Sequence, residues 1–183
     1  MAVNVLFATS NASKVREAKA ALGPNWKITH KNVDVPEVKT ESMEQTIRQK
    51  AEAAFFLVKR PVLVEDTGFF LDAYPHFPGT YTKFCVQRIG INGFLKLLEG
   101  KNRGARFETW LAYHDGKKVR VFRGSVTGIV AKAPRGKAAE KLPYDLIFVP
   151  NGDERTYAEM DLTEKQRTSH RAKAFENFKK AFS

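Results

Sequence analysis

The segment at residues 62–68 constrains the fold most strongly, because an apolar run is followed at once by two adjacent carboxylates. Its sequence is Val-Leu-Val-Glu-Asp-Thr-Gly, and three branched apolar residues in a row are typical of a buried strand. The interior of a strand has no need of Glu65 and Asp66. Asp is common at strand ends, so an ordinary turn also accounts for the pair. We favour a strand that carries acids to a functional site, because other parts of the chain offer chemistry that suits phosphate.

Periodicity and turn signals predict both helices and strands. A capping pattern at Ser42 and Gln45 precedes an apolar stripe of helical period, and Asp115-Gly116 separates two strand-like runs, as in a hairpin. The predicted helices are residues 14–22, 43–58, 91–98 and 169–182. The predicted strands are residues 3–8, 26–33, 62–65, 105–113, 118–124, 126–131 and 146–149.

The order of these elements indicates the fold class. Helices and strands alternate early in the chain and hairpins dominate later, which is typical of an α/β fold with a mixed central sheet and flanking helices. Residues 74–81 are rich in Gly and Pro, and we predict an irregular loop over the site there. The chain has 183 residues, of which 43% are hydrophobic, enough for one core. We therefore expect residues 1–183 to form a single domain with two lobes around a cleft.

The composition narrows the functional class. The net charge of +11 is consistent with a nucleic-acid-binding module or with an enzyme whose substrate is a small polyanion. The basic residues are spread along the chain, with clusters at residues 132–141 and 166–180. No apolar run approaches the roughly 20 residues that cross a bilayer, and a secretory leader is missing, so we expect a cytoplasmic protein without a membrane partner. The single cysteine, Cys85, excludes an internal disulfide and is expected to pack.

A possible anion site follows the first predicted strand. Strand, tight turn and helix start together present free backbone N–H groups and the positive end of the helix dipole. The side chains of Thr9, Ser10 and Asn11 can donate to phosphate oxygens, and Lys14 adds a positive charge in the first turn. The spaced glycines and the Gly-Lys-Ser/Thr ending of a P-loop are missing. An ordinary helix N-cap accounts for the same residues, so the pattern leaves both interpretations open.

Asp66 is the leading candidate for chemistry. Asp66-Thr67-Gly68 also occurs in aspartic proteases, but those enzymes are almost entirely β, whereas strong helix patterns flank the motif here. Carboxylates without His or Cys favour Mg²⁺, which takes one or two protein carboxylates and completes its shell with water and substrate phosphates. Glu37 is the candidate second carboxylate. These residues predict a Mg²⁺-dependent enzyme that acts on a phosphorylated substrate.

Several ordered motifs make the chain resemble the inosine triphosphate pyrophosphatase family, also called Ham1-like, over nearly its whole length. The motifs are Thr-Ser-Asn-Ala-Ser-Lys at 9–14, Val-Leu-Val-Glu-Asp-Thr at 62–67, Pro-Gly-Thr-Tyr-Thr-Lys at 78–83, Phe-Arg-Gly at 122–124, Pro-Arg-Gly at 134–136, Thr-Tyr-Ala-Glu-Met at 156–160 and Ser-His-Arg at 169–171. The resemblance implies hydrolysis of ITP, dITP and XTP to the monophosphate and pyrophosphate. It also implies Mg²⁺, a homodimer and a role in cleansing the nucleotide pool.

The resemblance also implies roles for particular residues. Glu37 and Asp66 would bind the metal, and Asp66 would accept the proton of the attacking water. Lys50 and Lys83 would neutralise phosphate charge. The residues implied to hold the triphosphate are Thr9, Ser10, Asn11, Ala12, Ser13, Lys14 and Thr67. The residues implied to reach the base and its neighbouring phosphate are Leu142, Pro143, Tyr144, Asp145, Lys165, His170 and Arg171.

One departure concerns recognition of the base. Where the family usually has Phe-Gly-Tyr/Trp-Asp-Pro, this chain has Leu-Pro-Tyr-Asp-Leu at residues 142–146. Leu142 cannot stack on a purine as Phe does, so discrimination against GTP or ATP is expected to be looser. A pyrophosphatase for a different modified nucleotide therefore stays an alternative, as does the nucleic-acid-binding module suggested by the charge.

Overall fold

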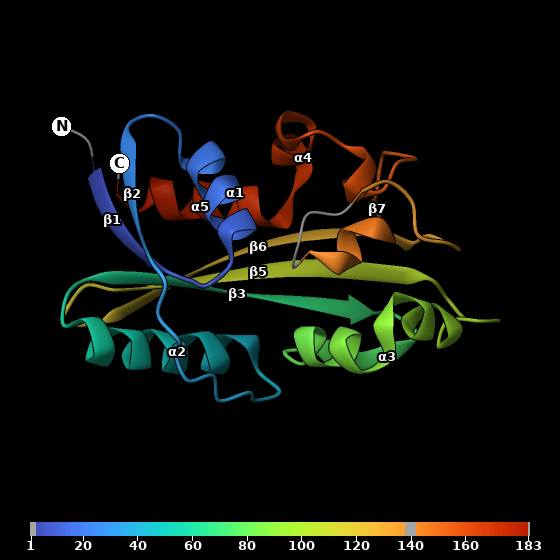
Figure 1. Cartoon of the computed structure of the whole chain (residues 1–183), viewed down its shortest axis with the longest axis horizontal. Helices are drawn as coiled ribbons and strands as arrows, with labels where there is room; N and C mark the ends of the chain where they lie inside the picture. The colour runs from blue at the N-terminus through green and yellow to red at the C-terminus, as the bar shows by residue number, and fades with distance from the viewer. Residues whose placement is uncertain (1–2, 138–141, 183) are drawn as a thin grey trace.

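The computed structural model describes residues 3–137 and 142–182. Its centre is a mixed sheet, and the spatial order of its strands is β2-β1-β3-β5-β6-β7, with β4 paired to β3 (Figure 1). The strands are β1 (Val3–Ala8), β2 (Trp26–Lys31), β3 (Val62–Leu71), β4 (Tyr74–Gly79), β5 (Gly104–His114), β6 (Val119–Val130) and β7 (Phe148–Pro150). Strand β1 is parallel to β2 and β3, and the other pairs are antiparallel. The predicted fold class is confirmed.

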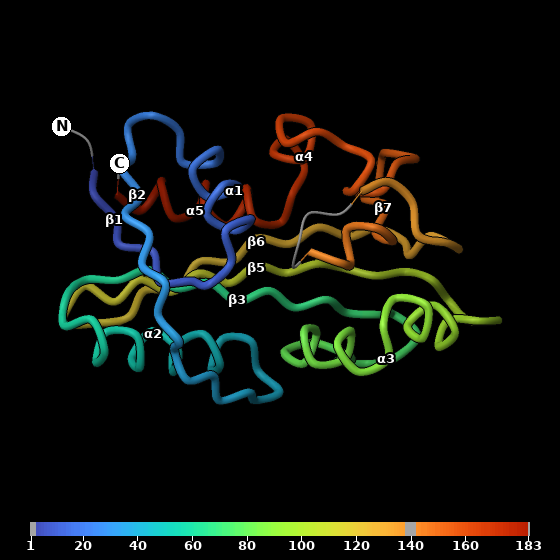
Figure 2. Tube along the Cα trace, viewed as in Figure 1, coloured from blue at the N-terminus to red at the C-terminus, as the bar shows by residue number. Residues whose placement is uncertain are grey.

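Helices cover both faces of the sheet. They are α1 (Ala12–Leu22), α2 (Met43–Val58), α3 (Thr82–Lys96), α4 (Leu162–Thr168) and α5 (His170–Lys180), with short 3₁₀ turns η1 (Pro143–Leu146) and η2 (Tyr157–Glu159). Figure 2 shows α1, α4 and α5 on one side and α2 and α3 on the other. Alternate residues of a strand point to opposite faces. Phe7 and Leu63 therefore pack against α1 and α5, whereas Leu6 and Val64 pack against α2.

Two local predictions are confirmed in detail. Ser42 caps α2, since its hydroxyl accepts a hydrogen bond from the backbone N of Gln45 at 3.3 Å. Asp115 holds the β5–β6 turn, accepting from the backbone N of Lys117 and of Lys118 at 2.9 Å each. Short-range capping and turn chemistry therefore determine both features.

Other local predictions are wrong. Residues 74–79 form β4 rather than an irregular loop. This strand lies at the edge of the sheet and pairs with β3 around a bulge, a position in which Pro75 and Pro78 are tolerated. Helix α3 begins at Thr82 rather than at residue 91, with a kink at Gly90 that divides it. Helix α4 was not predicted.

Strand β3 also runs further than predicted, through Leu71. Glu65 and Asp66 therefore lie inside the strand and not at its end. They lie beyond the point where β1 and β3 pair, which is Phe7 opposite Leu63. Glu65 and Asp66 therefore lie where β1 no longer runs beside β3.

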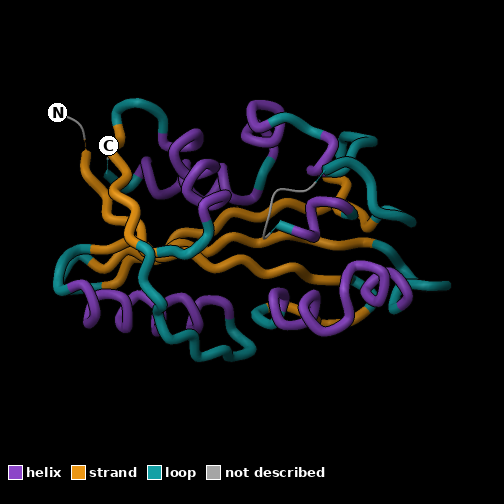
Figure 3. The backbone as a smooth tube through the Cα atoms, viewed as in Figure 1, coloured by secondary structure: helices purple, strands orange, loops and turns teal. Residues whose placement is uncertain are grey.

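The loop between β2 and α2, teal in Figure 3, carries Glu37 and Lys39. Within the described residues, no helix has the length and apolar character needed to cross a bilayer. Cys85 is half-buried. Of the basic cluster at residues 132–141, the last four residues lie outside the described part of the chain.

Candidate active site

A cavity of about 630 Å³ lies where β1 and β3 separate. After Ala8 the chain leaves β1 and turns into α1, while β3 continues past Asp66. In parallel sheets such a separation is a common place for a ligand. The predicted site residues that line this cavity are Thr9, Ser10, Asn11, Lys14, Glu37, Lys50, Asp66, Thr67, Lys83, Leu142, Pro143, Tyr144, Asp145, His170 and Arg171. Ser13 and Lys165 line a smaller adjacent cavity, and Ala12 lines neither.

The turn after β1 is an N-cap that also faces the cavity. Asn11 Oδ1 accepts hydrogen bonds from the backbone N of Ser13 at 3.0 Å and of Lys14 at 3.3 Å. The side chain of Lys14 lies 3.2 Å from Glu65 Oε1. Burial lowers the pKa of Lys14 and the Glu65 carboxylate opposes that change. A lysine in a first helical turn is unfavourable on its own, and Glu65 supplies the anion that offsets it.

Glu37 and Asp66 converge on one ammonium group. Lys39 Nζ lies 2.6 Å from Asp66 Oδ2 and 3.2 Å from Glu37 Oε2. Lys50 forms an ion pair with the other oxygen of Glu37 and donates to the backbone oxygen of Glu65 at 3.0 Å. Partial burial by itself raises the pKa of Glu37, but Lys50 and Lys39 outweigh it and lower that pKa to about 2. Carboxylate oxygens of Glu37 and Asp66 therefore face the same cation, the ammonium group of Lys39.

This arrangement fits a divalent cation with few protein ligands. The described residues contain no group of three or more His, Cys, Asp or Glu side chains arranged to hold a metal. Mg²⁺ needs only one or two protein carboxylates when water and phosphate complete its octahedron. Because Glu37 and Asp66 already share the Lys39 ammonium, both carboxylates face the same point of the cavity.

A buried ion network lies behind the cavity. Arg171 Nε lies 3.1 Å from both carboxylate oxygens of Glu65, and Arg171 also forms an ion pair with Glu17. Thr67 donates to Glu65 Oε1 at 3.0 Å. Burial raises the pKa of Glu65, but Arg171 and Lys14 together lower it to about 2. Glu65 is therefore a charged structural residue, and Asp66, on the opposite face of β3, is the acid that lines the cavity.

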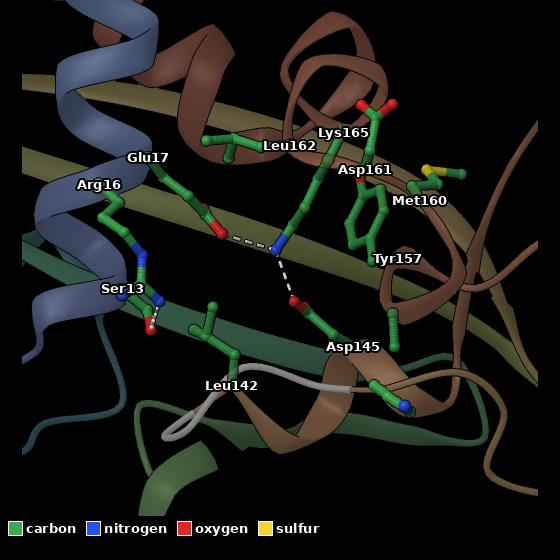
Figure 4. A pocket seen from close by; sticks show the side chains of 12 residues that line it. Ser13, Arg16, Glu17, Leu142, Asp145, Tyr157, Met160, Asp161, Leu162 and Lys165 are labelled. Carbon is green, nitrogen blue, oxygen red and sulfur yellow. Dashed lines mark hydrogen bonds and ion pairs between the residues drawn. The ribbon is translucent and has the colours of Figure 1, made fainter.

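The network continues to the smaller cavity of about 190 Å³. Figure 4 shows Lys165 between two acids, Glu17 on α1 and Asp145 on η1. Lys165 Nζ donates to Glu17 Oε1 at 2.7 Å and to Asp145 Oδ2 at 2.5 Å. Burial raises the pKa of Asp145, and Lys165 opposes this rise. The two cavities share Leu142 and Asp145 in their walls.

His170 and Tyr144 are held by neutral contacts. The His170 ring stacks on Phe107 with 4.5 Å between centroids, and its Nδ1 lies 2.6 Å from Thr109 Oγ1. Burial, together with the charge of Arg171, lowers the pKa of His170 well below its usual value. The Tyr144 hydroxyl donates to the backbone oxygen of Thr82 at 2.9 Å. Both rings therefore form the wall of the cavity, and the imidazole is neutral.

The Phe-Arg-Gly motif has a packing role. A Cβ on Gly124 would lie 2.1 Å from the backbone oxygen of His170 and 2.4 Å from the backbone N of Ala174. Helix α5 therefore lies directly on β6 at this glycine. The close approach places the start of α5, with His170 and Arg171, against the sheet.

Sequence reasoning missed Lys39 and Glu17. Lys39 follows Glu37 by two residues in a loop, and nothing in its spacing marks it as a partner of Asp66. Glu17 lies on the buried side of α1 between Ser13 and Ala18. A charged residue at that position was the available signal, but its partners Arg171 and Lys165 come from the far end of the chain.

Fold and cavity define an α/β protein whose lysine-rich cleft adjoins a pair of carboxylates, a class of site suited to phosphate chemistry. The chain belongs to the Ham1 family, whose profile matches residues 5–181. It is 40% identical over 178 residues to a dITP/XTP pyrophosphatase of Saccharolobus solfataricus, covering 96% of this chain and 92% of the relative. It is 37% identical over 181 residues to inosine triphosphate pyrophosphatase 1 of Trypanosoma cruzi, covering 97% and 91% of the two chains.

A solved structure agrees with these similarities. The HAM1 protein of Coxiella burnetii superposes with a TM-score of 0.80 at 26% identity, covering 98% of both chains. The predicted family resemblance is confirmed.

Proposed function

We propose that this protein is a nucleoside triphosphate pyrophosphatase that hydrolyses ITP, dITP and XTP to the monophosphate and pyrophosphate. The observation that carries the proposal is the convergence of Glu37 and Asp66 at a cavity that Lys14, Lys39 and Lys50 also line. The similarity to proteins named dITP/XTP pyrophosphatase and inosine triphosphate pyrophosphatase supports the substrate class.

The proposed chemistry places the polyphosphate along the lysines. The turn at Thr9, Ser10 and Asn11 binds phosphate oxygens with Lys14, while Lys50 and Lys83 neutralise further charge. Glu37 and Asp66 would hold Mg²⁺, which would supply positive charge beside the phosphates. Asp66 orients a water molecule and accepts its proton. The water oxygen bonds to the α-phosphorus, the bond from that phosphorus to the α–β bridging oxygen breaks, and pyrophosphate leaves with the bond's electron pair.

The base is proposed to enter the smaller cavity beside Lys165. An ammonium group donates hydrogen bonds and accepts none. Two of its protons already go to Glu17 and Asp145. The third pairs with the 6-keto oxygen of hypoxanthine or xanthine, whereas the 6-amino group of adenine offers it no acceptor. Such a mismatch of buried polar groups discriminates more strongly than a lost methylene does.

The wider setting follows from this activity. We propose that residues 1–183 act as one catalytic domain, because residues from both ends of the chain, on the turn after β1 and on α5, line one cavity. A homodimer and action on the cytoplasmic nucleotide pool are further parts of the proposal, and both rest on the resemblance. Nucleic-acid binding rests on the +11 net charge alone, and steep salt dependence of binding to DNA or RNA would support it.

The first experiment incubates the purified protein with Mg²⁺ and, separately, ITP, XTP, dITP, GTP and ATP. Phosphorus NMR identifies the product as pyrophosphate or orthophosphate. We expect pyrophosphate, released fastest from ITP, XTP and dITP. Orthophosphate as the product, or no turnover of any of the five nucleotides, would contradict the proposed function.

A further inference from the structure

Lys39 occupies an unusual position between the two carboxylates assigned to the metal. Its ammonium contacts Asp66 Oδ2 at 2.6 Å and Glu37 Oε2 at 3.2 Å. The side chain is 21% exposed and lines the main cavity. One monovalent cation of the chain itself thus contacts both acids and offsets part of their charge.

Lys50 also contacts Glu37, but it is held differently. It is part of α2, and besides Glu37 it donates to the backbone oxygen of Glu65 at 3.0 Å. Lys39 stands on the loop between β2 and α2, and its ammonium pairs with the two carboxylates. Of the two lysines, Lys39 is the one that can leave Glu37 and Asp66 without breaking a backbone contact.

Two cations cannot share this pair of acids at low cost. A divalent ion bound by Glu37 and Asp66 would repel an ammonium within a few ångströms of it, and the repulsion is strong in a partly buried site. A nucleotide polyphosphate changes the balance because it brings several negative oxygens into the same cavity. Those oxygens offer Lys39 a new partner at the moment that it leaves the carboxylates.

We propose that Lys39 is an exchangeable counter-ion of the Glu37–Asp66 pair. In the free protein it pairs with both acids, offsets part of their charge and weakens their binding of a divalent cation. The cation therefore enters together with the nucleotide, and the released ammonium turns to the polyphosphate. The inference rests on the proposed function for the identity of the substrate, but its first half concerns metal binding by the free protein alone.

Metal affinity without nucleotide tests the first half. Mn²⁺ is the probe, and electron paramagnetic resonance measures its free concentration during a titration of the protein. Lys39→Gln removes the charge, Lys39→Arg keeps it, and Lys27→Gln removes one charge from an exposed site on β2. We expect Lys39→Gln to bind Mn²⁺ about tenfold more tightly than the wild type, since one charge-assisted competitor is lost. The other two variants should bind like the wild type.

Equal or weaker Mn²⁺ binding by Lys39→Gln would overturn the inference, and so would tighter binding by Lys27→Gln to the same extent. Absence of Mn²⁺ binding by Lys39→Gln would also overturn it, because the freed carboxylates are required to take the ion. Circular dichroism melts of all variants identify any loss of fold.

Kinetics at saturating Mg²⁺ test the second half. Lys39→Gln should raise KM for ITP, and Lys39→Arg should restore it, because the charge rather than the length of the side chain meets the phosphates. An unchanged KM in Lys39→Gln would overturn the proposal that Lys39 contacts the polyphosphate after it leaves the carboxylates. Failure of the proposed function is separate, since the Mn²⁺ titration needs no turnover. Tighter Mn²⁺ binding by Lys39→Gln with no pyrophosphate from any nucleotide would support the counter-ion role and contradict the activity.

Discussion

Arg171 on α5 and Glu65 on β3 form a buried ion pair, with Arg171 Nη2 3.0 Å from Glu65 Oε1. Arg171 also pairs with Glu17 on α1. The three residues connect the first helix, the central strand and the last helix behind the cavity. The network therefore fixes the wall against which Asp66 and the turn after β1 are positioned.

The first prediction concerns Glu65. Glu65→Gln leaves Arg171 and Lys14 buried with less negative charge beside them, and removing one partner of a buried ion pair costs about 3–5 kcal/mol. We expect a loss of that size in the free energy of unfolding, measured by urea denaturation at neutral pH. The control is Glu41→Gln, at an exposed position. A loss as small as that of the control would mean that the network does not stabilise the fold.

The second prediction is a pH dependence of stability caused by His170. In the folded protein its pKa lies well below 6.5, so the unfolded chain binds a proton there that the folded chain does not. The free energy of unfolding should therefore fall as pH drops below about 6.5, by up to about 1.4 kcal/mol per pH unit. Glu65 and Glu37, with folded pKa values of about 2 against 4.5, should add a second loss as pH falls from about 4.5 toward 2.

Urea denaturation between about pH 8 and pH 5.5 checks the loss of stability attributed to His170. This range spans the ordinary pKa of histidine, about 6.5. His170→Asn should be less stable at pH 8 but nearly independent of pH. His76→Asn is the control, because His76 is exposed and has a φ of 61°, which Asn tolerates. If the free energy of unfolding of His170→Asn changes with pH as steeply as that of the wild type, a group other than His170 causes the pH dependence.

The third prediction concerns Gly124. Gly124→Ala places a methyl group against the backbone of α5 at His170 and Ala174, and overpacking of this kind costs about 1–3 kcal/mol. Because α5 carries Arg171 into the buried network, turnover should fall as well. Gly100→Ala is the control, since its added Cβ meets open space and only its φ of +67° is strained. Full activity in a stable Gly124→Ala protein would show that α5 can shift to accept the methyl group without loss of stability or function.

The fourth prediction concerns Asp66. Asp66→Asn keeps the shape of the side chain but removes the negative charge of the proposed base and metal ligand, so turnover of ITP should fall by roughly 10²–10⁴-fold. The fold should remain, as judged by circular dichroism. Asp153→Asn is the control, because Asp153 also forms an ion pair, with Arg155, but on the surface. Wild-type rates from a folded Asp66→Asn variant would exclude Asp66 from the mechanism.

The features that were predictable from the sequence are those that depend on near neighbours. Ser42 caps α2 through Gln45, and Asp115 closes its hairpin through the next few residues. A similar signal was overlooked at α4, where Asp161 and Glu164 form a capping box. The helix has only seven residues, so its apolar period is too short to stand out.

The roles of the two acids on β3 depended on distant partners. The period of a strand already separates Glu65 from Asp66, one to each face. Which face meets Arg171, and which meets Lys39, is decided by how α5 and the β2–α2 loop pack. Arg171 is 106 residues from Glu65 and Lys39 is 27 residues from Asp66, and no local pattern encodes either distance.

The last prediction concerns base recognition at Leu142, which lines both cavities. Leu142→Phe offers an aromatic face to the base, and stacking of this kind is worth about 1–3 kcal/mol, so KM for ITP should fall about tenfold. Every purine has such a face, so KM for ATP should fall by a similar factor and the preference for ITP over ATP should stay the same. This outcome differs from the sequence-based expectation that Leu142 loosens discrimination, because the proposal places selectivity at Lys165. Steady-state kinetics with both nucleotides measure this, with Leu57→Phe, an exposed position on α2, as the control. A large change in the ITP to ATP ratio would place selectivity at residue 142 rather than at Lys165.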